Sequence, residues 1–180
     1  MSAPTRLLVI PGSLRRASTH AGLARAAAEL APIDLEVRVV GLREIPFFDA
    51  DLEVPEAVES LKAAITAADG VLLASPEYNY SVSGVLKNAI DWASRPAYAS
   101  PFFKKKCAVM ATSPGPVGGA RGLMHLRSVL AGMGADIYPG LEFRIALSKQ
   151  RFDEEGNLTD DESRQRLAVH LTEIAEWIRA

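Results

Sequence analysis

Two loops of this chain carry residue types that could bind a phosphorylated, planar ligand. The first is GSLRRAS, residues 12–18, which follows a short apolar run. Ser13 and Ser18 offer hydroxyl groups. Arg15 or Arg16 offers a guanidinium fork that pairs well with phosphate. A helix beginning after this loop would direct free N–H groups and partial positive charge at the same point, so the loop suits a phosphate. The alternative is a plain strand-to-helix turn with a serine cap and surface arginines.

The second loop is SPEYNYSVSG, residues 75–84, which also follows an apolar run. Tyr78 and Tyr80 can cover or edge an aromatic ring, and Asn79 offers both a donor and an acceptor to a polar ring edge. Backbone N–H groups near Glu77 could hold the electron-rich edge of such a ring. Together with the phosphate loop, this predicts a mononucleotide with a planar ring, and flavin is the leading candidate. The alternative is a surface turn with ordinary tyrosines.

A third loop, SPGPVGGARG at residues 113–122, is rich in glycine. Gly115, Gly118 and Gly119 would let the backbone approach a ring edge or an incoming substrate closely. Arg121 could pair with the phosphate of a nicotinamide cofactor or with an acid of a neighbouring subunit. A flexible loop with a solvated arginine is the alternative.

Several other chemistries lack their sequence signature. The phosphate loop lacks the GxGxxG motif of dinucleotide-binding folds and the GxxxxGK(S/T) motif of nucleotide triphosphatases. Both absences disfavour those two functions. The three histidines show no metal-ligand spacing, and no Ser-His-Asp nucleophile pattern is present. No side chain is predicted to be an essential acid or base. The single cysteine, Cys107, begins the apolar run CAVMA and is predicted to be a small buried core residue.

The composition is that of an ordinary globular protein. The 180 residues include 48% hydrophobic and 23% charged residues, which suits one domain over residues 1–180 with a full core. A net charge of −2 gives no indication of a nucleic-acid partner. No apolar run approaches the roughly 20 residues that span a bilayer, so no membrane association is predicted. The N-terminus has only four consecutive apolar residues before Pro11, so a cytoplasmic protein is expected.

The elements that must position these loops follow from the hydrophobic pattern, which alternates between short apolar runs and helical periodicity. Pro55 suits the first turn of a helix, where its missing N–H loses no bond. Thr159 is a predicted hydroxyl cap, with Glu162 three residues later. Strands are predicted at 6–10, 35–40, 70–74, 106–112 and 135–138, and helices at 18–30, 55–68, 83–94, 120–133 and from 159 onward.

This alternation predicts a three-layer α/β fold, with a parallel sheet and helices on both faces. We expect the flavodoxin-like strand order 2-1-3-4-5, with five strands. In such sheets, ligands bind outside the carboxyl ends of the strands, where the winding direction reverses. The loops after the first and third strands flank that point. These are the two loops that carry the phosphate-binding and ring-binding candidates.

The three loops together resemble those of the NADPH-dependent FMN reductase family, which includes soluble bacterial quinone, chromate and azo reductases. The resemblance rests on GSLRRAS, SPEYNYSVSGVLKNAIDW and SPGPVGGARG in this order and spacing, and it extends from residue 6 to the final helix. The block from PEYN to DW is its most specific part. The resemblance implies a single flavodoxin-like FMN-binding domain over residues 1–180.

The resemblance also implies a set of FMN-binding residues in this sequence. The phosphate site would fall on Ser13, Arg15, Ser18 and His20, and the ring site on Pro76, Glu77, Tyr78, Asn79 and the adjacent Tyr80, with Ser113 and Gly115 closing the other side. His20 departs from the family pattern, in which this position is often an asparagine. Its ring N–H could still donate to the phosphate, and FMN affinity would then depend on pH.

The implied reaction has two steps. NADPH or NADH delivers a hydride to non-covalently bound FMN and leaves. A quinone or a similar small-molecule acceptor, such as chromate or an azo compound, then takes two electrons. Two other classes stay open, namely a flavodoxin-type electron carrier without a substrate of its own and a flavin-free interaction protein on the same fold.

A homodimer or homotetramer with sites near subunit boundaries is a further implication of the resemblance. In some relatives an arginine, a tyrosine and a glutamate link subunits. Arg121 and Glu142 match the arginine and the glutamate, whereas Met124 stands where the tyrosine would be. The sequence therefore does not carry the complete tetramer contact.

Overall fold

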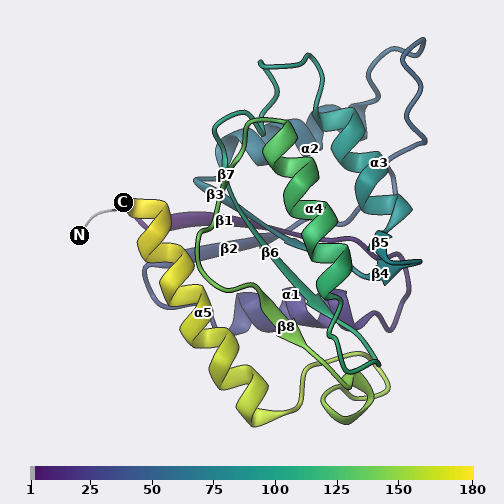
Figure 1. Cartoon of the computed structure of the whole chain (residues 1–180). Coiled ribbons are helices and arrows are strands. Elements are labelled where there is room, and N and C mark those ends of the chain that lie inside the picture. The colour runs from purple at the N-terminus through teal and green to yellow at the C-terminus, as the bar shows by residue number, and fades with distance from the viewer. Residues whose placement is uncertain (1–2) are drawn as a thin grey trace.

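Four parallel strands make up most of the sheet in the computed structural model, which describes residues 3–180. β1 (Thr5–Pro11) lies between β2 (Leu35–Val39) and β3 (Gly70–Ala74), and β6 (Lys106–Thr112) lies beyond β3 (Figure 1). The three inner strands are buried almost throughout, as a parallel sheet covered on both faces requires. The predictions of strands at 70–74 and 106–112 are confirmed at these bounds.

The fifth position of the sheet is shared by two short strands. β7 (Asp136–Ile137) pairs with the first two residues of β6, and β8 (Phe143–Ile145) pairs with its last three, both in parallel. Pro139 and Gly140 lie between them, and a proline cannot donate a ladder hydrogen bond. The order 2-1-3-4-5 is therefore confirmed for the five positions, while the prediction of five strands is corrected to six.

Helices cover both faces of the sheet, which confirms the flavodoxin-like architecture (Figure 1). Their bounds are α1 Thr19–Glu29, α2 Glu56–Ala67, α3 Gly84–Ala93, α4 Ala120–Gly132 and α5 Asp161–Arg179, with a short 3₁₀ helix at Ser148–Gln150. α1 and α5 pack on one face through side chains such as Leu23 and Leu171. α2, α3 and α4 pack on the other through Ile65, Ile90 and Leu126. No helix within residues 3–180 is both long and apolar enough to cross a membrane.

The predicted starts of the helices are confirmed in part. Ser18 caps α1 as predicted, because its hydroxyl accepts a hydrogen bond from the N–H of Ala21 at 3.3 Å. Pro55 precedes α2 as its N-cap residue rather than lying in the first turn. At α5 the prediction of Thr159 as the cap is wrong, since Asp160 accepts the N–H of Ser163 at 2.8 Å. A carboxylate there also interacts favourably with the helix dipole.

The loop after β3 contains a small antiparallel hairpin that the sequence did not predict. It consists of β4 (Glu77–Tyr78) and β5 (Ser81–Val82), joined by Asn79 and Tyr80. These two residues have φ angles of 50° and 67°. A two-residue turn with both φ angles positive matches the twist of the strands that it joins. Asparagine adopts this conformation readily, whereas a tyrosine rarely does, so the backbone of Tyr80 is strained.

Cys107 is fully buried in the core between the sheet and the helices α2, α3 and α4. Burial in apolar surroundings raises the pKa of its thiol to about 12. The thiol therefore stays protonated and unreactive at neutral pH. The prediction of a structural core cysteine is confirmed.

His20 links α1 to the sheet. Its ring is only 5% exposed, and Nε2 accepts the backbone N–H of Thr112, at the end of β6, at 3.2 Å. Burial lowers the pKa of His20 from 6.5 to about 4, and a backbone contact with Ser75 offsets this only in part. The imidazole is therefore neutral at pH 7, which is the state in which Nε2 can accept this hydrogen bond.

The depressed pKa of His20 predicts a loss of stability in mild acid. Between pH 6.5 and about 4 the unfolded chain binds a proton at this position that the folded chain does not, so the free energy of unfolding falls as pH falls. The contribution of His20 amounts to about 3 kcal/mol at pH 4 relative to pH 7. Urea unfolding at both pH values should show a smaller loss in His20→Gln than in the wild type, because glutamine has no basic group there.

His125 provides the matched control, since it is exposed on α4. The stability of His125→Gln is measured at the same two pH values, which separates the effect of His20 from the loss of any histidine. An equal loss of stability in the wild type and in His20→Gln would show that His20 does not titrate as proposed.

Candidate functional site

The three predicted loops meet at one edge of the sheet, where β1, β3 and β6 end (Figure 1). The N–H of Gly12 donates to the carbonyl of Ala74 at 2.8 Å, and the N–H of Ser75 donates to the carbonyl of Met110 at 3.0 Å. These bonds extend the ladder beyond the regular strands and fix how each loop leaves the sheet. The site therefore lies at the reversal of winding, where folds of this type bind ligands.

Gly12 is required by packing against α3. The hydroxyl of Ser83 donates to the carbonyl of Gly12 at 2.7 Å and accepts the N–H of Leu86 at 3.3 Å. A Cβ atom on Gly12 would lie 2.9 Å from the Cβ of Leu86, which is too close. The first and second loops are thus joined through a serine that the sequence analysis did not single out. The sequence signal for Ser83 was its position immediately before a predicted helix, where serine is a preferred N-cap residue.

The loop between β1 and α1 presents groups that suit an anion. Arg15 is exposed, and its backbone N–H donates to the hydroxyl of the half-buried Ser13 at 3.4 Å. The hydroxyl of Ser18 accepts from the N–H of Ala21 and keeps its own O–H for another partner. The first N–H groups of α1 have no acceptor inside the helix. An anion at this end would also be stabilised by the helix dipole.

The ring of His20 has a different role from the one that the sequence indicated. It points into the molecule toward Thr112, and it is uncharged at neutral pH. A buried neutral imidazole cannot supply the charge-assisted, pH-sensitive contact expected for a phosphate. Of the groups of His20, only the backbone N–H remains available to a phosphate at the start of α1.

The hairpin presents two aromatic rings beside this loop. Tyr78 and Tyr80 are 51% and 64% exposed, whereas Pro76 is buried. The guanidinium of Arg121 lies 4.4 Å from the centre of the Tyr80 ring, within the range of a cation–π contact. Large exposed aromatic groups on a strained turn provide a surface on which a planar ligand can pack.

Glu77 attaches the hairpin to α4. Its Oε2 accepts the N–H groups of Arg121 and Gly122, each at 3.0 Å, and its Oε1 lies 3.4 Å from Nη1 of Arg121. The residue at the start of α4, Gly119, has no side chain with which to cap it. A carboxylate from another loop therefore satisfies the free donors of this helix. Arg121 was expected to face a nicotinamide phosphate or another subunit, but its partners here are Glu77 and Tyr80.

The third loop is anchored rather than free. The N–H of Ser113 donates to the carbonyl of Ile145 on β8 at 3.0 Å, and the carbonyl of Gly115 accepts the N–H of Leu147 at 3.2 Å. Gly118 and Gly119 have φ angles of 67° and 83°, which favour glycine. A Cβ atom on Gly119 would also lie 2.8 Å from the Cβ of Ala111. These two glycines allow the loop to turn tightly into α4.

Thr112 supplies an additional polar group that the sequence analysis missed. Its hydroxyl is buried at the carboxyl end of β6 and has no hydrogen-bond partner within residues 3–180. A buried hydroxyl without a partner is costly unless a ligand or water completes it. With the hydroxyl groups, the guanidinium and the N–H groups of the first loop, the donor set fits a phosphorylated ligand with a planar ring. The available signal was the position of Thr112, as the last residue of a strand beside the reversal point.

Comparisons with known proteins agree with this geometry. The family model for NADPH-dependent FMN reductase matches residues 5–150. An NAD(P)H-dependent FMN reductase of Pseudomonas aeruginosa is 39% identical over 184 residues, which cover 99% of this chain and 98% of the relative. A 2-hydroxy-1,4-benzoquinone reductase of Burkholderia sp is 39% identical over 176 residues, which cover 97% and 96%.

A solved structure shows the same fold over nearly the whole chain. FerB, a flavoenzyme NAD(P)H:(acceptor) oxidoreductase from Paracoccus denitrificans, superposes with a TM-score of 0.87 at 33% sequence identity. The match covers 97% of each chain. The chain therefore belongs to the NADPH-dependent FMN reductase family.

Proposed function

We propose that this protein is an FMN-dependent NAD(P)H oxidoreductase that reduces quinones or similar small acceptors. The observation that carries the proposal is the meeting of an anion-binding helix start and an aromatic hairpin, which Glu77 fixes to α4. Membership of the family, together with the benzoquinone reductase and NAD(P)H:(acceptor) oxidoreductase relatives, supports the same reaction class. The protein takes FMN as a non-covalent cofactor and NADPH or NADH as co-substrate.

The two ends of the cofactor are assigned to different loops. Ser13, Arg15, Ser18 and the first N–H groups of α1 hold the phosphate. The segment of Pro76, Glu77, Tyr78, Asn79 and Tyr80 lies along the ring system, and Ser113 and Gly115 border it on the opposite side. Gly118 and Gly119 shape the base of the third loop, and Arg121 holds the hairpin in place while one face stays open to the nicotinamide and the acceptor.

The residues of this chain contribute binding and orientation. The hydride chemistry between the nicotinamide and the acceptor would be supplied by FMN held at these residues. Glu77 and Arg121 keep the hairpin at a fixed distance from α4, so that the ring would be held without reorganisation on binding. No side chain of the site is assigned as an acid or a base. The acceptor class is therefore set by access to the open face rather than by a catalytic side chain.

The organisation of the active protein is also part of the proposal. We assign residues 1–180 to one FMN-binding domain that acts as a homodimer or homotetramer in the cytoplasm. Glu142, which matches a subunit-linking position of relatives, lies 3.7 Å from Arg127 and 3.9 Å from Arg144 of its own chain. Met124, at the position of the tyrosine, is 63% exposed. A tetramer would therefore use a contact different from that of those relatives.

The reaction is tested by loading the protein with FMN and following NADPH and NADH oxidation with benzoquinone. We expect turnover that requires both the nicotinamide and the quinone, and parallel lines in double-reciprocal plots, because the two substrates use one site in turn. FMN-loaded protein that oxidises neither nicotinamide in the presence of benzoquinone would exclude the enzyme and leave an electron carrier.

The phosphate assignment predicts different effects for two adjacent arginines. Arg15→Ala should weaken FMN binding by about 1.5–3 kcal/mol, since it removes a charge-assisted hydrogen bond. Arg16→Ala, also exposed in the same loop, is the matched control and should bind nearly as tightly as the wild type. Quenching of FMN fluorescence on binding measures both affinities. Equal affinities in the wild type and Arg15→Ala would contradict the assignment.

The contact of Glu77 with α4 predicts a loss of both stability and cofactor affinity. Glu77→Ala leaves the N–H groups of Arg121 and Gly122 without their carboxylate, which should lower the free energy of unfolding by about 1–3 kcal/mol. The freed hairpin should also bind FMN more weakly, because its position is no longer fixed. Glu77→Gln keeps one acceptor oxygen and should lie between the wild type and Glu77→Ala. Urea unfolding and FMN titration of all three proteins make the measurement.

A further inference from the structure

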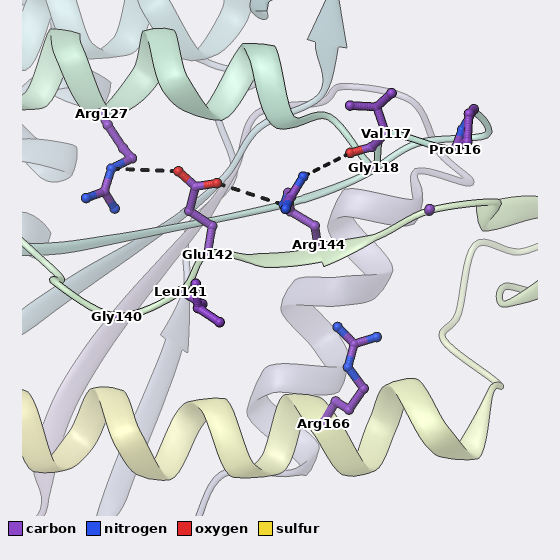
Figure 2. A pocket seen from close by; sticks show the side chains of 10 residues that line it. Pro116, Val117, Gly118, Arg127, Gly140, Leu141, Glu142, Arg144 and Arg166 are labelled. Atoms are coloured by element: carbon purple, nitrogen blue, oxygen red, sulfur yellow. Dashed lines mark hydrogen bonds and ion pairs between the residues drawn. The ribbon is translucent and has the colours of Figure 1, made fainter.

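A pocket lies beside the edge strand β8 and adjoins the third loop. It has a volume of about 620 Å³ and lies between α4 and α5, bordered by the base of the third loop (Figure 2). Arg127 comes from α4, Glu142 and Arg144 from the edge of the sheet, and Arg166 from α5. Pro116, Val117 and Gly118 close one end with their backbone. Apart from Gly118, which shapes the base of the third loop, the proposed reaction uses none of these residues.

The charges of this pocket are unbalanced. Its charged lining residues are three arginines and one glutamate, which gives a net charge of +2. Glu142 is shared between two of the arginines, at 3.7 Å from Nε of Arg127 and 3.9 Å from Nε of Arg144. Neither distance is short enough for a strong, bidentate pair. The single carboxylate therefore orients the two guanidinium groups without neutralising them.

Arg166 has no acidic partner within 4.0 Å among residues 3–180. Its guanidinium lies 5.6 Å from the centre of the Phe143 ring, and Figure 2 shows it extending from α5 toward β8. A cation–π contact keeps an arginine ordered while leaving its N–H donors free. The side chain is thus held at the pocket by an aromatic contact rather than by an ion pair within residues 3–180.

Backbone contacts hold Arg144 in place as well. Its Nη1 donates to the carbonyl of Val117 at 3.3 Å, and Gly118, with a φ of 67°, lies beneath it. A Cβ atom on Gly118 would come within 3.3 Å of the Cβ of Arg144. Arg127 likewise donates from Nη1 to the carbonyl of Tyr138 at 3.2 Å. Each of these two guanidinium groups therefore approaches the pocket from a fixed position.

We infer that this pocket binds a small dianion that carries a phosphate group or two carboxylates. Two negative charges match the excess of two positive charges, and oxygen pairs match the planar N–H forks of Arg127, Arg144 and Arg166. Binding offsets the repulsion among three like charges that line one pocket. The pocket shares the third loop with the proposed FMN site, but its arginines are not assigned to FMN, and its occupation does not depend on the proposed reaction.

The test is a calorimetric titration of protein incubated with FMN, so that the phosphate loop is already filled. Inorganic phosphate and succinate are titrated separately, at constant ionic strength maintained with chloride. We expect one dianion to bind per chain, and Arg166→Gln to weaken binding roughly tenfold or more. Binding of phosphate alone would assign a phosphate-bearing ligand, and binding of succinate alone would assign a dicarboxylate.

Two further variants make the result specific. Glu142→Gln removes the competing carboxylate and should tighten dianion binding by roughly two- to fivefold, an increase that damage to the fold would not produce. Arg38→Gln removes an exposed arginine from β2, at the opposite edge of the sheet, and should leave binding unchanged. The inference is overturned if neither dianion binds the wild type, or if affinity is the same in Arg166→Gln and Glu142→Gln as in the wild type.

Discussion

The carboxylate of Glu77 is the contact on which the arrangement of the site depends. α4 begins after two glycines with positive φ, so its first N–H groups have no local side chain to accept them. Glu77 reaches them from the hairpin and accepts two N–H bonds at 3.0 Å. Hydrogen bonds to charged groups contribute about 1.5–3 kcal/mol each. The helix obtains its cap, and the hairpin obtains its position, from one interaction between segments more than 40 residues apart.

Other contacts make the three loops into one unit around this bond. Ser83 joins the first loop to α3 through the carbonyl of Gly12. Arg121 pairs with Glu77 and also covers the Tyr80 ring, which offsets part of the strain of that tyrosine's positive φ. A surface assembled in this way before ligand binding has little conformational freedom left to lose. The strained turn is therefore understandable as part of a rigid support for a planar group.

The sequence predicted those parts of the fold that depend on local pattern. The buried strands at 70–74 and 106–112 each contain a continuous apolar run, and their bounds were predicted correctly. The division of the fifth position into β7 and β8 was missed because strands of two and three residues leave almost no periodic signal. The partner of Glu77 and the inward direction of His20 were missed for another reason. Both depend on contacts with residues far away in the sequence, which no local pattern encodes.

Glu77 and Glu142 differ in how far their negative charge is balanced by the cations around them. This difference explains why one fixes structure and the other lines a pocket. Glu77 accepts two backbone N–H groups and pairs with one arginine, so its charge is matched and it fixes structure. Glu142 faces two arginines at 3.7 and 3.9 Å, with a third in the same pocket, so positive charge remains. The same ion-pair chemistry thus closes one side of the third loop and leaves the other able to accept an anion. The number of cations around each carboxylate, rather than the residue types themselves, separates a structural contact from a binding site.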